Sequence, residues 1–324
     1  MAERLISDIS QKRLLAWYTD NYRRLPWRET RDPYSILVSE VMLQQTQAER
    51  VVPKYHEFLA RFPTLEALAD APASEAIRAW AGLGYNRRAL NLQRACRAVV
   101  ERFGGVMPSD PTDLASLPGI GPYTAGAVAC FAFEQDVGFV DTNIRRVIHR
   151  LLAGPELPEP LMTAREIDQA ARDLVPAGRG YPWNQALMEL GATICRARMT
   201  ECERCPLQAE CHARPTIQTV LATQPRQTRR SEPKFKTTSR YYRGRIIDAL
   251  RSVGADGLSL AELGAAINPE FAPTDATWIA GHVAGLRSDG LLVAHDVGQR
   301  LVAEEALPYD AETVDLNRRY RLPD

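Results

Sequence analysis

The chain has 324 residues, of which 45% are hydrophobic and 25% charged, proportions typical of a globular protein with a sizeable core. No apolar run approaches the roughly 18 residues that span a bilayer, and the polar first residues do not resemble a signal peptide, so we expect a cytoplasmic protein without a membrane partner. The 40 basic and 40 acidic residues cancel, and net charge therefore gives no indication of a nucleic-acid partner.

Residues 1 to about 220 carry apolar residues at helical spacing, separated by short proline and glycine punctuation. The expected helices are 36–58, 65–71, 74–81, 87–103, 113–117, 123–133, 142–152 and 163–174. The alternation of strands and helices that builds a parallel nucleotide-binding sheet does not occur in this pattern. We therefore predict a mainly α fold for this part of the chain.

The helical pattern is lost at residues 216–239, which we interpret as a linker. Residues 226–245 hold eight basic residues and one acid, which fits either a solvated linker or a strap along DNA phosphates. For residues 240–305 we predict a small α+β domain. Its helices are expected at 242–252, at 260–267 with Ser259 as the cap, and at 277–289, and residues 291–294 are expected to pair with 299–302 as a hairpin. This is the outline of a winged helix, or of a helical interaction module without DNA contact, and 306–324 are expected to be a tail.

Four of the six cysteines fall within 17 residues, in the pattern C-x6-C-x2-C-x5-C. Short loops of this kind bring four thiolates to the corners of one [4Fe–4S] cluster, whereas structural zinc sites usually use two separated C-x2-C pairs. We favour the cluster as cofactor and keep zinc as the alternative. The four metal ligands would be Cys195, Cys202, Cys205 and Cys211, while Cys96 and Cys130 are expected to be plain core residues.

A glycine-containing turn and two acids complete the candidate site. In Leu117–Gly121, sequence LPGIG, the glycines Gly119 and Gly121 let backbone N–H groups approach an anion just before a helix N-terminus, which suits one DNA phosphate or a purely structural hairpin. Glu40 lies among apolar residues of an expected helix. Asp141 follows an apolar pair and precedes another helix, so it is either a helix cap or a catalytic acid.

Taken together, the motifs LPGIGPYTAGAV, VDTNIRRV and the cysteine loop resemble the helix–hairpin–helix DNA glycosylase superfamily. The segments LVSEVMLQQTQ (37–47), GLGY (82–85) and NQALMELGATIC (184–195) resemble its adenine DNA glycosylases, which remove adenine mispaired with 8-oxoguanine. The resemblance implies a two-lobed fold, with a cluster domain of 1–29 and 139–215 and a six-helix barrel domain of 30–138 that carries the hairpin. It also implies a monomer that acts on double-stranded DNA with a mispaired or damaged base, at the nucleoid.

The resemblance further implies a role for each matching residue. Glu40 would protonate the purine and Asp141 would stabilise the positive charge that develops on the sugar, with Tyr123 and Asn143 as supporting polar residues. Gln45 and Tyr85 would enter the base stack where the target base leaves, since the bond is inaccessible inside a duplex. The substrate-binding residues would be Arg23, Leu25, Trp27, Arg28, Leu43, Gln45, Thr46, Tyr85 and Glu189.

The sequence differs from the adenine glycosylases at two points, and three alternative functions stay open. Members commonly follow GLGY with a second tyrosine, where this chain has Asn86, and the Phe-Ser-His loop that reads 8-oxoguanine does not occur in the sequence. The alternatives are a thymine or uracil mismatch glycosylase acting opposite guanine, a glycosylase with lyase activity, and a DNA-binding iron–sulfur protein without catalysis. Because lyases of this superfamily use a lysine where Tyr123 stands, we expect a monofunctional glycosylase.

Overall fold

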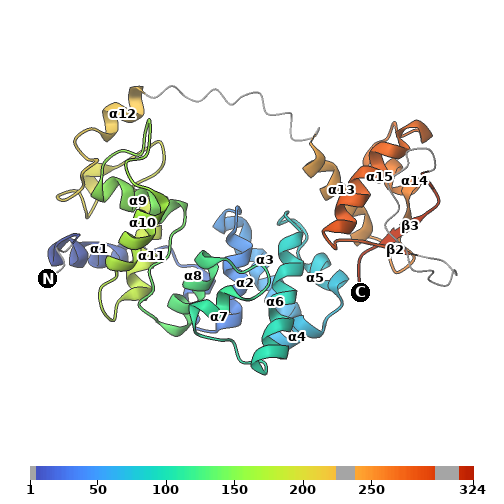
Figure 1. The fold of residues 1–324 in the computed structure, drawn as a ribbon, viewed down its shortest axis with the longest axis horizontal. Coiled ribbons are helices and arrows are strands. Elements are labelled where there is room, and N and C mark those ends of the chain that lie inside the picture. The colour runs from blue at the N-terminus through green and yellow to red at the C-terminus, as the bar shows by residue number, and fades with distance from the viewer. Residues whose placement is uncertain (1–4, 224–237, 296–313) are drawn as a thin grey trace. The chain divides into compact units, whose positions relative to one another are not determined.

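The computed structural model describes residues 5–223, 238–295 and 314–324, and its described part is mainly helical with one small sheet (Figure 1). Single 3-10 turns occur at Pro26–Arg28, Cys202–Arg204 and Pro273–Asp275. The helices before residue 224 are α1 (Asp8–Asn21), α2 (Pro33–Leu43), α3 (Ala48–Arg61), α4 (Leu65–Asp70), α5 (Ala73–Ala79), α6 (Arg87–Phe103), α7 (Pro111–Ala115), α8 (Pro122–Phe133), α9 (Thr142–Leu152), α10 (Ala164–Asp173), α11 (Gly180–Thr193) and α12 (Ile217–Thr223).

The chain forms two compact units, each made of two separate segments. The first comprises Met1–Gln44 and Met107–Thr228, and the second comprises Gln45–Val106 and Arg229–Asp324. The sequence analysis grouped 30–138 together, whereas the structure joins 45–106 with the C-terminal segment. The physical reason is a shared apolar core, in which Ile77 and Leu90 pack with buried residues beyond 240.

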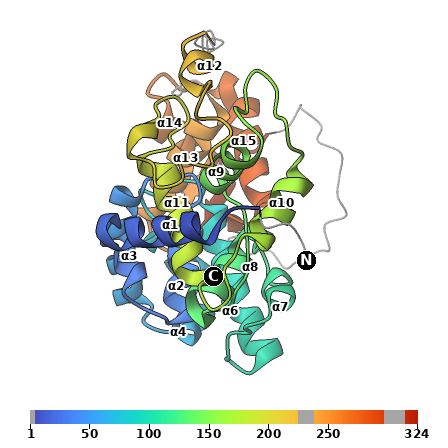
Figure 2. The same cartoon turned by 90° about the vertical axis from the view of Figure 1, so that its left-hand side faces the viewer.

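In the first unit, α2 packs against α8, and α11 packs against both α1 and α9 (Figure 2). Helix α2 begins with a side-chain cap, because Asp32 accepts a hydrogen bond from the Ser35 N–H at 2.8 Å, and Pro33 occupies its first turn. Every residue from Ile36 to Met42 is buried, so the helix is enclosed on all sides rather than on one face. Glu40 is the single acid in this buried stretch.

The predicted helix 36–58 is wrong as a single element, because α2 ends at Leu43 and α3 begins only at Ala48. Between them Gln45 adopts φ 57°, a left-handed conformation that a right-handed helix does not contain. Other boundaries agree closely with the prediction, and α6 and α9 have the predicted bounds. Helix α12 lies where a linker was expected, and residues 224–237 lie outside the described residues, so the basic strap is untested.

The C-terminal domain, meaning the described residues from 238 onward, contains α13 (Ser239–Arg251), β1 (Leu258–Ser259), α14 (Leu260–Ile267), α15 (Ala276–Ser288), β2 (Val293–His295) and β3 (Arg319–Arg321). The strands form an antiparallel sheet in the order β1-β3-β2, with Tyr320 paired to Leu258 on one side and to Ala294 on the other. Helices α13, α14 and α15 and strand β2 lie close to the positions that the winged-helix outline gave them, and Ser259 caps α14 as expected, whereas β1 was not predicted.

The central strand of this sheet comes from a segment that the sequence analysis assigned to a tail. Residues 319–321 form β3, and Tyr320 and Leu322 are buried in the domain core. The predicted hairpin partner, 299–302, lies outside the described residues. Alternation of apolar and polar residues cannot be recognised in a strand of only three residues, which explains why the sequence pattern did not identify β3. None of the described helices has the length and apolar character needed to cross a membrane.

Candidate active site

Glu40 and Tyr123 meet where α2 packs against α8. Glu40 is 3% exposed, and the Tyr123 hydroxyl donates a hydrogen bond to its Oε2 at 2.9 Å. Burial raises the pKa of Glu40 to about 7, and the nearby Asp141 carboxylate acts in the same direction, while the hydrogen bond from Tyr123 and the charge of Arg28 oppose it. A carboxyl group with this pKa keeps a substantial protonated fraction at neutral pH and can donate a proton there.

Asp141 has the position of a helix cap and of a site residue at once. It is the N-cap of α9, where its Oδ1 accepts from the Ile144 N–H at 2.6 Å and its Oδ2 accepts from the Asn143 amide at 3.0 Å. Burial raises the pKa of Asp141, whereas these hydrogen bonds lower it. The two sequence interpretations of Asp141 are therefore compatible, because capping fixes the carboxylate in the first turn of α9.

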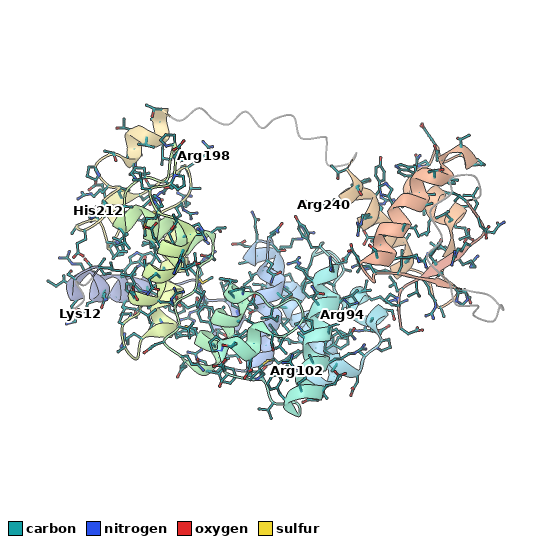
Figure 3. All side chains as sticks on the ribbon, in the orientation of Figure 1. Lys12, Arg94, Arg102, Arg198, His212 and Arg240 are labelled. Carbon is teal, nitrogen blue, oxygen red and sulfur yellow. The ribbon has the colours of Figure 1, made fainter. Side chains whose placement is uncertain are left out.

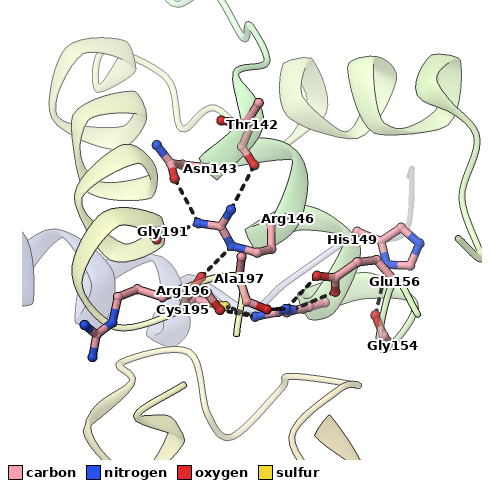
Figure 4. Close-up of polar contacts among 11 residues, drawn as sticks. Thr142, Asn143, Arg146, His149, Gly154, Glu156, Gly191, Cys195, Arg196 and Ala197 are labelled. Atoms are coloured by element: carbon pink, nitrogen blue, oxygen red, sulfur yellow. Dashed lines mark hydrogen bonds and ion pairs between the residues drawn. The ribbon is translucent and has the colours of Figure 1, made fainter. Parts of the chain in front are cut away.

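A chain of polar contacts runs from Asn143 to the cysteine loop (Figure 4). The Asn143 Oδ1 accepts from Arg146 at 2.8 Å, and the same guanidinium donates to the Gly191 carbonyl at 2.6 Å and the Cys195 carbonyl at 2.7 Å. Arg146 thus ties α9 to the end of α11 and to the first predicted metal ligand. Sequence reasoning did not assign a role to Arg146, although it lies within the quoted VDTNIRRV motif.

A third carboxyl group, Glu189 on α11, is fully buried between two arginines. Arg23 donates to it at 2.6 Å and Arg28 at 2.8 Å, and Arg28 also donates to Gln185 at 2.9 Å. The structure therefore brings three predicted pocket residues, Arg23, Arg28 and Glu189, into contact. Trp27 is buried and Leu25 and Leu43 are half-buried, and a pocket role for any of these residues stays a prediction. Gln185 was missed, but its place four residues before Glu189 on one helix puts both on the same face.

The turn between α7 and α8 has the glycine conformation that the LPGIG motif suggests. Gly119 adopts φ 76°, which other residues rarely tolerate, and the Ile120 N–H donates to the Leu117 carbonyl at 3.1 Å. Gly121 is the N-cap of α8 with extended backbone, and Pro122 follows at the first helical position. The turn therefore presents the start of α8 as the sequence analysis predicted, and it sets Tyr123 in the first turn of that helix.

Three predicted substrate-binding residues, Gln45, Thr46 and Tyr85, belong to the second unit. Gln45 and Tyr85 have positive φ angles of 57° and 46°, conformations that cost roughly 1–3 kcal/mol each and cluster at functional sites. The Arg88 guanidinium donates to the Thr46 hydroxyl at 3.3 Å and to the carbonyls of Leu83 and Gly84, each at 3.2 Å. Arg88 therefore connects the two strained loops, a role that the sequence did not reveal.

The four clustered cysteines line one cavity, together with Arg150 and residues of the loop around them. Arg150 is buried, forms a two-pronged ion pair with Glu156 and places Nη1 3.6 Å from the Cys195 sulfur. Within the described ranges no group of three His, Cys, Asp or Glu side chains is arranged as a metal site. The donor set of four thiols around one cavity still fits an iron–sulfur cluster or zinc, both of which bind thiolates.

The two remaining cysteines behave as predicted for core residues. Cys96 and Cys130 are buried, and burial raises the pKa of each thiol to about 12. Neither thiol is therefore activated as a nucleophile at neutral pH.

The burial of Glu40 predicts a pH dependence of folding stability. Because the pKa is about 7 in the folded chain against 4.5 for an exposed carboxyl, the folded state holds the proton more tightly. The stability of the parent protein relative to Glu40→Gln should therefore fall by up to about 3 kcal/mol as pH rises from 4.5 to 7, and stay level above pH 7. Urea unfolding of both proteins across this range measures the difference, and a difference that is constant with pH contradicts the assigned pKa.

Comparison with known proteins shows the family of the chain. Residues 38–173 match the model of the HhH-GPD superfamily of base excision DNA repair proteins. An adenine DNA glycosylase of Mycolicibacterium smegmatis is 38% identical over 307 residues, covering 94% of this chain and 98% of that protein. The human adenine DNA glycosylase is 42% identical over 214 residues, or 63% of this chain and 39% of the human protein.

Solved structures show the same fold over about two thirds of the chain. A thermostable thymine-DNA glycosylase is 33% identical with a TM-score of 0.59, covering 64% of this chain and 95% of that one. Endonuclease III in a non-covalent DNA complex covers the same shares with a TM-score of 0.56, and at 22% identity it shows the fold alone. The chain belongs to the adenine DNA glycosylase family, within the helix–hairpin–helix superfamily of base excision DNA repair proteins.

Proposed function

We propose that this protein hydrolyses the N-glycosidic bond of adenine mispaired with 8-oxoguanine or guanine in double-stranded DNA, as a monofunctional glycosylase of base excision repair. The observation that carries the proposal is Glu40, a buried carboxyl group with a pKa of about 7 and a hydrogen bond from Tyr123. Cleavage of this bond needs an acid to protonate the leaving purine at neutral pH, and an exposed carboxyl would already be ionised.

The proposed mechanism uses the two carboxyl groups in different roles. Glu40 donates its proton to the extruded purine, which turns the base into a good leaving group. Asp141 faces the positive charge that grows on the sugar, and its hydrogen bonds with the Ile144 N–H and Asn143 hold it in place. Tyr123 orients the Glu40 carboxyl through its hydroxyl and remains protonated, because burial raises its own pKa well above the ordinary value.

We further propose that the buried Glu189 and its two arginines shape the base pocket, with Trp27, Leu25 and Leu43 as its apolar lining. Gln45 and Tyr85 would enter the base stack, Thr46 would support them, and the backbone at Gly119 and Gly121 would hold one phosphate. In this proposal residues 1–29 and 139–215 form the cluster domain and 30–138 the hairpin domain. A monomer acting on chromosomal DNA would work at the nucleoid, in the cytoplasm.

For the cysteine cavity we propose a [4Fe–4S] cluster held by Cys195, Cys202, Cys205 and Cys211. When bound, such a cluster supplies a rigid cross-link between the four cysteine positions of the loop, and base removal requires no electrons from it. Arg150 supports this use of the cavity. Burial raises the pKa of the Cys195 thiol, and the positive charge of Arg150 beside its sulfur opposes that shift and stabilises the thiolate form that binds iron.

Glu40→Gln should abolish adenine release while leaving mismatch binding intact, because the amide keeps the shape of the side chain and loses the proton. We expect single-turnover excision from an A:8-oxoguanine duplex to fall by at least about 10²-fold, the lower end of general acid catalysis. In the parent protein the rate should decline as pH rises above about 7, as Glu40 ionises. Glu57→Gln, at an exposed position on α3, is the control and should keep the parent rate.

A variant rate within about tenfold of the parent would remove Glu40 from the acid role. The same assay on duplexes with T or U opposite G tests the second candidate function, which the likeness to a thymine-DNA glycosylase favours. Release of thymine or uracil in preference to adenine would replace the proposed substrate.

Purified protein should be brown and carry about four irons per chain, because four thiolates around one cavity satisfy one cubane cluster. Metal analysis and the visible absorption spectrum measure this. Cys202→Ser and Cys205→Ser should each lower the iron content, whereas Cys96→Ser should not, since Cys96 is a buried core residue. A colourless and fully active protein with one zinc per chain contradicts the cluster.

The enzyme should release the base without cutting the strand, because β-elimination uses an amine that forms a Schiff base with the sugar. Tyr123 stands at the lyase position, and no lysine occurs in the sequence between Tyr55 and Pro233. Borohydride trapping and strand cleavage without hot alkali should therefore be negligible on an adenine-containing duplex. Cleavage that keeps pace with base release overturns this expectation. Tyr123→Lys is the single change expected to introduce lyase activity.

A further inference from the structure

The loop from Gly82 to Asn86 has a backbone that must be held in place from outside. Gly82 and Gly84 adopt φ angles of 86° and 72°, and Tyr85 adopts 46°. A side chain of the size of tyrosine occupies the left-handed region only where its surroundings fix it there. Tyr85 is also 41% exposed, so its own ring contributes little burial to stabilise this conformation. The fixing contacts must therefore come from residues around the loop.

One set of these contacts comes from Trp80 and Arg88, which flank the loop in sequence, and from α3. The Trp80 indole donates to the Gly84 carbonyl at 3.1 Å, and Arg88 donates to the carbonyls of Leu83 and Gly84. Arg50 of α3 donates to the Gly82 carbonyl. These contacts fix the carbonyls up to residue 84, and the Arg88 and Ala89 N–H groups donate to the Tyr85 and Asn86 carbonyls at 2.9 and 3.1 Å. They leave the Asn86 side chain to another partner.

That partner is Arg251, at the end of α13 in the C-terminal domain. Its guanidinium donates to the Asn86 Oδ1 at 2.8 Å, to the Ile77 carbonyl at 3.0 Å and to Asp248 at 2.5 Å. The Arg251 side chain is only 11% exposed, so these bonds are shielded from water. Asn86 is the N-cap residue of α6, yet its side chain makes no capping bond, and its amide oxygen is used for Arg251 instead.

The other end of α13 reaches Tyr85. The Arg240 guanidinium lies over the Tyr85 ring, 4.9 Å from its centroid, and Figure 3 shows Arg240 at the first turn of α13. An arginine over an aromatic face is attracted by the ring's negative potential. Helix α13 therefore contacts the loop at two places, with Arg240 on Tyr85 and Arg251 on Asn86.

The C-terminal domain is joined firmly to the helices on which the loop stands. Ala73, Ile77 and Leu90 of α5 and α6 share one apolar core with Ile246 and Ile247 of α13. Two polar contacts add to this core, since Arg78 donates to the Val253 carbonyl at 3.0 Å and the Ser74 N–H donates to the Pro323 carbonyl at 2.7 Å. A shift of α13 would therefore be transmitted to the loop.

We propose that Arg251 is a positioning residue for base extrusion, through which the C-terminal domain holds the Gly82–Asn86 loop in the conformation that inserts Tyr85 into DNA. The inference rests on the proposed function, in which Tyr85 enters the base stack. It also gives a structural reason for Asn86, where adenine glycosylases commonly have tyrosine, because the asparagine oxygen accepts the Arg251 bond and a phenol ring has no amide oxygen to offer there.

The test separates base extrusion from base release. A duplex with 2-aminopurine opposite 8-oxoguanine, on a 2′-fluoro sugar that resists hydrolysis, reports extrusion as a rise in fluorescence. Arg251→Ala and Asn86→Ala should each lower the extrusion equilibrium about tenfold, the size expected of one charge-assisted hydrogen bond. The double variant should lose no more than either single one, because both remove the same bond. The pH at which excision declines should not change, since Glu40 is untouched.

Arg319→Ala is the matched control, because Arg319 donates to the carbonyls of Asp256 and Gly257 within the C-terminal domain alone. It should extrude the base as the parent does. If Arg251→Ala proves poorly folded, Asn86→Ala still tests the bond, since Arg251 keeps its other two partners. Parent-like extrusion in Asn86→Ala, additive losses in the double variant or an equal loss in Arg319→Ala overturns the proposal. A parent protein that extrudes the base yet releases no adenine would refute the proposed function and leave this inference standing.

Discussion

The removal of the Glu40 carboxyl group from water is the constraint on which the site depends. Helix α2 is buried on all sides, and burial raises the pKa of a carboxyl group on it unless a strong partner stabilises the negative charge of the carboxylate. The Tyr123 hydroxyl is a partner of intermediate strength, which satisfies the carboxyl without forcing it to ionise. An arginine in place of Tyr123 would have held the group ionised and removed its use as an acid. The placement of Tyr123 therefore matters as much as the presence of Glu40.

Two glycines allow the close packing of α8 and α11 against residues 139 and 143 that this placement needs. A Cβ atom on Gly126 of α8 would lie 2.8 Å from the Phe139 Cβ, and a Cβ atom on Gly191 of α11 would lie 2.7 Å from the Asn143 Cβ. Both distances are too short for real side chains, so a larger residue would push Phe139 or Asn143 away. Phe139 packs edge-on against Tyr123, and Asn143 supports Asp141. Gly126 therefore helps to place Tyr123 beside Glu40, and Gly191 helps to place Asn143 beside Asp141.

The sequence predicted most of the fold where the signal was local. Helix α9 combines a strong apolar period with an Asp141 cap, and α14 has a capping box at Ser259, so both were located correctly. The break after α2 was missed because Gln45 takes a left-handed conformation without the glycine that usually marks one. Strand β3 was missed because its pairing partners lie far away in sequence. The positions of Glu40 and Asp141 beside apolar residues likewise made them candidates, and the family resemblance gave them roles. Arg251 has a role only through nonlocal contacts, and the bonds of Arg88 to Thr46 and of Gln185 to Arg28 are nonlocal too.

Several arginines of this chain are used inside the fold. Only four of the 40 basic residues are lysine, an excess of arginine that bidentate phosphate contacts would explain. In the structure three of these arginines use several N–H groups inside the fold. Arg146 donates to the Gly191 and Cys195 carbonyls, and Arg150 donates to the Arg196 and Ala197 carbonyls and to Glu156. Arg251 donates to the Ile77 carbonyl and to the Asn86 side chain. A lysine ammonium is a compact point charge and cannot bridge segments in this planar way. Arg146, Arg150 and Arg251 therefore serve the internal structure of the protein, and part of its arginine content is explained without any contact to DNA.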